Sequence, residues 1–161
     1  MDIFKEYEEL KKNVEFKKFQ RDENDYYLVH ALVPEDSNRT EFGFFNAKKN
    51  KIIVFKTNPV EKMPEDDAFK EGKTITKIDI NKIKINYEEA IKKTQEILRK
   101  DHAQEVIKKK IIILQHIQEP VWNITSICVS LNIINIRINA ETGEIKRNHK
   151  DSLLNMAGMM K

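Results

Sequence analysis

The sequence predicts an α+β protein made of two related units, each with one helix packed on an antiparallel sheet of three to four strands. In each half of the chain, a segment with helical spacing of apolar residues precedes several short segments of strand character. Both sets of strands also contain similar hairpin sequences, FNAKKNKIIVF (45–55) and INAETGEIKRN (138–148). These features suggest a tandem duplication, with a chance match of two hairpins as the alternative. Whether the two sheets merge stays open.

The first unit is expected to span residues 1–58. Ile3, Tyr7, Leu10 and Val14 recur at intervals of three and four, which predicts one amphipathic helix over residues 3–18. Asp2 is a suitable N-cap for this helix. Strands are predicted at 25–33, 40–47 and 51–57, with a short turn at 48–50.

A connecting segment is expected at 59–82. Two prolines, a glycine and an acidic cluster between residues 58 and 72 are typical of a connection between units. Residues 74–85 are rich in β-branched side chains, so we expect them to cross the sheet before the next helix.

The second unit is expected to span residues 83–161. Asn86 can cap a helix, and Glu89 lies three residues later, as in a capping box. Tyr87, Ala90 and Ile97 belong to the apolar stripe of this helix. Strands are predicted at 109–117, 121–131, 133–140 and 144–149. The apolar tail at 152–161 is expected to dock on the sheet or to bind a partner.

The C-terminal half resembles the PepSY domain family over roughly residues 83–150. The resemblance lies in the helix start INYEEA, with Glu88, Glu89 and Ala90, and in the closing segment INAETGEI (138–145). It implies a cystatin-like arrangement, with a helix laid across an antiparallel sheet. It also implies a role in restraining or assisting a peptidase, although such domains are commonly exported or membrane-attached.

Composition excludes several classes of function. The 29 basic and 26 acidic residues are intermixed, which does not favour a nucleic-acid surface, and Lys108–Lys110 is the best basic candidate. The single cysteine, Cys128, excludes an intrachain disulfide. The first residues lack the pattern of a signal peptide, and no run is long enough to span a membrane. We therefore expect a cytoplasmic protein without a membrane association.

No catalytic, cofactor or metal motif is recognisable, and we expect no cofactor. The candidate partner or pocket residues are Trp122, His116, His30 and Asn123. Trp122 is expected either to anchor the core or to form the centre of a protein contact. Each histidine is either a structural strand residue or a general base, and His116 with Cys128 is a further candidate pair.

Three functions compete at this stage. The first is a non-enzymatic module that binds a protein or peptide through a sheet edge or the concave face of the sheet. The second is a ligand carrier or enzyme with a pocket between helix and sheet, lined by His30, His116 or Asn123. The third is weak nucleic-acid binding. A homodimer through a sheet edge or the C-terminal tail is also considered.

Overall fold

The computed structural model describes residues 2–68 and 75–155, which form a mixed α+β fold around one large antiparallel sheet. The helices in this part of the chain are α1 (Ile3–Lys12), α2 (Val14–Asp22), the short 3-10 helix η1 (Ile80–Lys82) and α3 (Tyr87–Asp101). The nine strands are β1 (Tyr27–Val33), β2 (Glu41–Asn46), β3 (Lys51–Lys56), β4 (Glu61–Lys62), β5 (Asp66–Asp67), β6 (Ile107–Ile117), β7 (Glu119–Cys128), β8 (Asn132–Asn139) and β9 (Ile145–Ser152).

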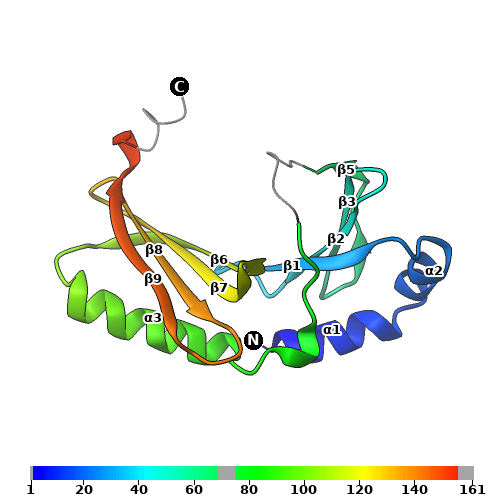
Figure 1. Ribbon diagram of the computed structural model, residues 1–161, viewed down its shortest axis with the longest axis horizontal. Coiled ribbons are helices and arrows are strands. Elements are labelled where there is room, and N and C mark those ends of the chain that lie inside the picture. Colours follow the sequence, from blue (N-terminus) through cyan, green and yellow to red (C-terminus); the bar gives the residue numbers. More distant parts are fainter. Residues whose placement is uncertain (1, 69–74, 156–161) are drawn as a thin grey trace.

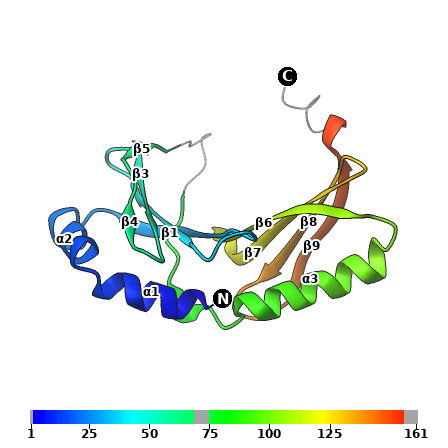
Figure 2. The ribbon, with the colours of Figure 1, turned by 180° about the vertical axis from the view of Figure 1, so that it is seen from behind.

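The sheet runs without interruption from one half of the chain to the other. Its strand order is β4-β3-β2-β1-β6-β7-β8-β9, and β5 also pairs with β3. At the centre, residues 30–33 of β1 pair with residues 112–115 of β6. Figures 1 and 2 show α1, α2 and α3 on one side of this sheet, while its two ends curve away from them. The side opposite the helices is therefore concave, and we call it the open face.

The predicted helix at 3–18 is wrong in its continuity, because Asn13 divides it into α1 and α2. Asn13 has an extended backbone (φ −67°, ψ 135°), and its Oδ1 accepts a hydrogen bond from the Phe16 amide at 3.1 Å. This new cap starts a second helix in another direction. As a result Phe16 and Phe19 are buried, whereas Val14, expected in the apolar stripe, is 82% exposed.

The predicted crossing strand at 74–85 is also wrong, because residues 75–85 contain only η1. One backbone bond, from Ile78 N to Leu28 O (2.8 Å), ties this segment to β1. Its isoleucines at 78, 80 and 83 are buried in the core. Their β-branched character thus reflects packing against the helices rather than sheet pairing. The preceding connection contributes the two short strands β4 and β5.

The main core fills the space between the helices and the sheet. Its N-terminal part is aromatic: Phe16, Phe19, Phe44 and Phe55 form a cluster with ring centroids 5.0–6.0 Å apart. The C-terminal part consists mainly of isoleucines around the fully buried Trp122. The described helix–sheet interface is therefore apolar.

The two hairpins share a turn geometry. Asn46 Oδ1 accepts bonds from the amides of residues 48 and 49, and Asn139 Oδ1 accepts bonds from the amides of residues 141 and 142. Asn50 (φ 54°) and Gly143 (φ 81°) then take the left-handed conformation. The hairpins differ in position, because the first joins β2 to β3 whereas the second joins β8 to β9, so the second half has one more strand before its hairpin.

Candidate functional site

The N-terminal part of the open face is covered by the chain itself. Val29, Phe45 and Ala68 form a small second core on this side, with Tyr27, Ile52 and Ile75 packed against it. The Tyr27 hydroxyl donates a hydrogen bond to Ile75 O at 3.1 Å. In Figure 1 the segment that includes residue 75 passes in front of β1 on its way to η1.

The C-terminal part of the open face is polar. Alternation along each strand sends every second side chain to the helix side, where Ile124 and Ile136 are fully buried. The intervening positions therefore face away from α3. On β7, β8 and β9 the adjoining polar residues of this open-face group are Asn123, Thr125, Asn135, Arg137, Arg147 and His149, which we call the polar patch; Ile127, Ile133 and Asp151 lie next to it on the same face. Leu32 and Ile113 continue the same row of residues toward the centre of the sheet.

A hydrogen-bonded asparagine organises the polar patch. Asn135 Nδ2 donates to Asn123 Oδ1 at 2.8 Å and to Thr125 Oγ1 at 3.2 Å. These bonds fix the orientation of the amide and leave its Oδ1 buried without a partner among the described residues. The Nε of Arg137, two positions further along β8, is likewise buried and unpartnered there. The patch thus retains one unused acceptor and one unused donor, both shielded from solvent.

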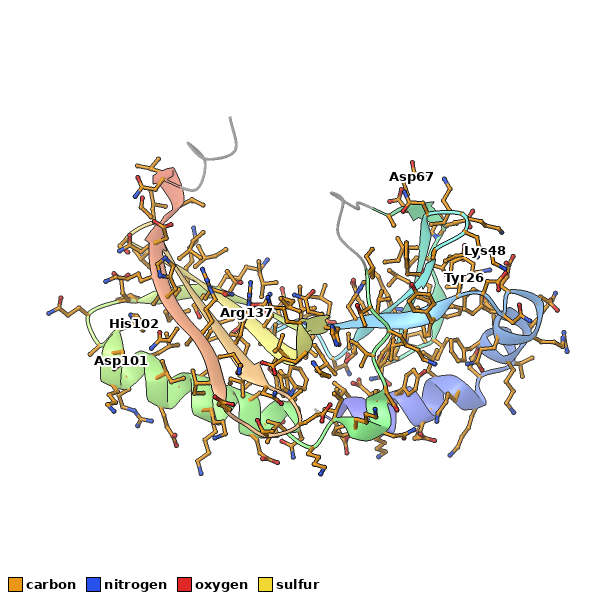
Figure 3. The ribbon with its side chains drawn as sticks, viewed as in Figure 1. Tyr26, Lys48, Asp67, Asp101, His102 and Arg137 are labelled. Carbon is orange, nitrogen blue, oxygen red and sulfur yellow. The ribbon has the colours of Figure 1, made fainter. Side chains whose placement is uncertain are left out.

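Arg137 and Arg147 stand directly opposite each other in the β8–β9 ladder. Burial, together with the positive charge of Arg147, lowers the pKa of the Arg137 guanidinium. Figure 3 places Arg137 over the sheet on the side away from α3, the helix that carries Asp101. Like charges at paired positions destabilise a sheet, so the two arginines oppose folding unless an anion joins them.

The four candidate residues from the sequence do not form one site. Trp122 is fully buried and donates from Nε1 to Ile85 O at 2.8 Å, so it anchors the core and presents no ring to a partner. Asn123 belongs to the polar patch. His30 faces the open side, paired with Gly43 and Gln115, whereas His116 shares the helix-side alternation of Leu114 and pairs with Pro120. The two histidines thus lie on opposite faces.

Cys128 is not an activated nucleophile. Burial and the neighbouring Glu105 carboxylate raise the pKa of its thiol to about 11. His116 pairs with Pro120 at one end of the β6–β7 ladder, and Cys128 pairs with Ile107 at the other. A catalytic pair of these two residues is therefore excluded. Within residues 2–68 and 75–155, no group of three His, Cys, Asp or Glu side chains could hold a metal ion.

Two of the clefts among the described residues, both outside the polar patch, contain residues of interest. One, of about 530 Å³, lies between α1, α2 and residues 77–81, and Tyr26, which donates a hydrogen bond to Glu65, lines it. The other, of about 580 Å³, brings Lys108–Lys110 beside Glu35 and Asp36, and the Lys110 amide donates to Glu35 Oε2 at 2.9 Å. The acidic neighbours make this lysine run a poor surface for phosphates.

The sequence contained only a weak signal for the polar patch. Arg137 is the one charged residue in the isoleucine-rich strand segment IINIRIN, and that exception was the available indication. Its relation to Arg147 depends on the strand register. None of the helices in the described residues is long and apolar enough to cross a membrane.

Comparison with known proteins identifies a fold neighbour but no family. No family model matches the chain, and no curated protein matches it. Among solved structures, the chain is similar to the crystal structure of a candidate lipoprotein from Clostridium difficile 630, with a TM-score of 0.54 and 14% sequence identity. The match covers 85% of this chain and 90% of that one. At this identity the likeness concerns the fold alone.

Proposed function

We propose that the protein is a non-enzymatic binding module that holds an extended peptide segment of a partner protein on the polar patch. The supporting observation is that two of the four buried polar atoms left without a partner among the described residues, Asn135 Oδ1 and Arg137 Nε, belong to this patch, whereas the other two, Ser126 Oγ and His102 Nδ1, lie on the helix side. Buried polar groups are nearly always satisfied, so two unused groups within one patch of the open face favour a ligand that completes them.

The chemistry of the patch suits a peptide. An extended chain carries both amide donors and carbonyl acceptors, and it can therefore satisfy Asn135 Oδ1 and an arginine at once. Leu32 and Ile113, beside the patch, offer apolar contact to alternate side chains of such a segment. No nucleophile, metal cluster or paired histidine among the described residues favours a reaction at this face.

We further propose that the chain consists of two related PepSY-like units in tandem. The shared Asx turns at Asn46 and Asn139 and the helices on one side of the sheet support this view. Matching the hairpins equates β1, β2 and β3 with β7, β8 and β9, which makes β6 the additional strand that joins the units. The PepSY-like resemblance supports a partner among peptidases, with a restraining or accessory role.

A blocking substitution tests the proposed function. Peptides selected from a displayed random library on the immobilised full chain are measured against Thr125→Trp, which places a large ring in the polar patch. Gln95→Trp, on the exposed side of α3, is the matched control. We expect selected peptides to bind the wild type and the control equally and Thr125→Trp at least about tenfold more weakly, a loss equal to about 1.4 kcal/mol. Failure to select any peptide, or equal binding to all three proteins, would refute the proposal.

The location of the protein is part of the proposal. We propose a cytoplasmic location, and a membrane-anchored location is the alternative because the fold neighbour is a candidate lipoprotein. Fractionation of cells that produce the natural protein, followed by immunoblotting, separates the two: recovery in the soluble fraction is the result that we expect. Recovery of the protein in the membrane fraction, with release only by detergent, would overturn it.

A further inference from the structure

The arginine pair, Arg137 and Arg147, differs from the salt-bridged glutamates of the open face. Glu41 is salt-bridged to Lys56 at 3.5 Å, and Glu119 is salt-bridged to Lys146 at 3.4 Å and accepts a hydrogen bond from Asn139 at 2.9 Å. Neither arginine has a carboxylate partner among the described residues, although the two are cross-strand neighbours. Lys109 and Asp151 also occupy open-face positions without a salt bridge in the described part of the chain, but the arginine pair sets two unpartnered charges of the same sign directly opposite each other.

The half-buried setting of Arg137 makes this position costly. Its guanidinium is partly desolvated, and its Nε reaches neither water nor an acceptor among the described residues. A buried donor without a partner and an uncompensated like charge both oppose folding. A bound anion would satisfy both, because a guanidinium holds a carboxylate through two parallel hydrogen bonds. Arg147 is exposed, so its side chain has room to contact the same anion.

We propose that the arginine pair recognises a carboxylate of an acidic peptide, and that Asn135 Oδ1 accepts an N–H from the same peptide. This inference rests on the proposed function and names the chemistry of the partner. Asn135 selects the class of ligand, because its amide is fixed with the acceptor oxygen unused and that oxygen needs a donor. A peptide supplies the carboxylate and the donor together, whereas the phosphates of a nucleic acid supply acceptors only.

The charge of the face fits an acidic segment. His149 follows Arg147 on the same face of β9 and faces Asn135 across the ladder, so its imidazole adjoins the pair. Asn123 and Thr125 complete a polar floor. The row then continues into Leu32 and Ile113, so a segment with acidic residues in one half and apolar residues in the other would match charge with charge and apolar with apolar.

The test uses a fluorescein-labelled octapeptide of four glutamates followed by four valines and its glutamine–valine analogue, both with amidated C-termini. Fluorescence anisotropy with the full chain is expected to show at least tenfold tighter binding of the glutamate peptide. Arg137→Gln and Arg147→Gln are each expected to weaken that binding about tenfold. Lys92→Gln on α3 removes the same charge from an exposed position away from the sheet and is expected to change it less than twofold. A version of the glutamine–valine peptide with a free C-terminus shows whether a terminal carboxylate suffices.

Several results would overturn the inference. Equal binding of the two amidated peptides, or an equal loss in Lys92→Gln, would mean that the pair does not read a carboxylate. Tighter arginine-dependent binding of a labelled single-stranded oligonucleotide would assign the pair to phosphates. If Thr125→Trp abolishes binding of the library peptides but neither arginine substitution does, the proposed function stands and this inference fails. If none of these variants has an effect, both fail.

Stability provides a second readout that does not depend on any ligand. Arg137→Gln removes one of two facing positive charges, so its melting temperature is expected to equal or exceed that of the wild type. Lower stability than in the wild type would show that Arg137 is already satisfied in the free protein, and would therefore contradict the premise of the inference.

Discussion

The close approach of His30 to Gly43 leads to a quantitative prediction. An ideal Cβ added to Gly43 would lie 2.0 Å from His30 Cε1 and 2.5 Å from each ring nitrogen. Non-bonded carbon atoms settle about 3.5 Å apart, so the ring would have to move by more than about 1 Å. The strand is glycine at this position because the imidazole occupies the space of a side chain.

Gly43→Ala is therefore expected to destabilise the protein. Overpacking of this kind costs about 1–3 kcal/mol. Alanine in place of glycine returns about 0.5–1 kcal/mol through a less flexible unfolded chain. The net loss is then about 0–2.5 kcal/mol of unfolding free energy. Urea denaturation followed by far-UV circular dichroism measures it as a shift of the midpoint at constant slope.

A double-mutant cycle isolates the cause. In a His30→Ala background the obstructing ring is gone, so Gly43→Ala should be neutral or stabilising. The coupling energy between the two positions should then be about 1–3 kcal/mol, which is large enough to measure for residues in contact. If Gly43→Ala costs the same with and without the imidazole, the argument from the close approach is wrong.

The same structure leads to three further tests. Trp122→Phe removes the bond to Ile85 O and shrinks a fully buried ring, so urea denaturation should show a loss of about 2–4 kcal/mol, and a loss below about 1 kcal/mol would contradict the core assignment. Burial lowers the pKa of His30, so the folded protein binds this proton less readily than the unfolded chain, whose histidine has a pKa of about 6.5. The urea midpoint should therefore fall as the pH drops below that value. His30→Gln should lose less stability over the same pH range. Gly143→Ala should cost about 1–2 kcal/mol in thermal melts because of its φ of 81°, whereas Asn50→Gly at φ 54° should be neutral or stabilising, and the same sign for both would argue against strained turns.

The sequence predicted the elements well where the signals were local. Asn86 caps α3 through a 2.8 Å bond from the Glu89 amide to Asn86 Oδ1, as its spacing indicated. The long strands were also located correctly to within a few residues. Asn13 was missed because an asparagine inside an amphipathic pattern is compatible both with a continuous helix and with a new cap. The isoleucines of 75–85 have strand propensity but serve the core instead, which only tertiary packing decides.

The polar patch was largely beyond prediction because it depends on register. Counting back from the turn at Gly143 in an unbroken ladder would place Arg137 opposite Lys146. The ladder is irregular there, however: Ile138 pairs with Ile145 and Arg137 pairs with Arg147, so Lys146 is an additional residue. A one-residue change reverses which side chains share a face. Asn123, singled out from the sequence, did reach the patch, but its contact with Asn135 was not foreseen.

The short seam between β1 and β6, of four residue pairs, ties together segments that are about eighty residues apart along the chain. If the two halves were produced as separate fragments, β1 and β6 would each become a free edge strand, with Leu32 and Val33 on one and Ile112 and Ile113 on the other. Each fragment would then pair its free edge strand with that of another copy of the same fragment. The separate fragments should consequently associate into dimers or fibres. The intact polypeptide should unfold in a single thermal transition.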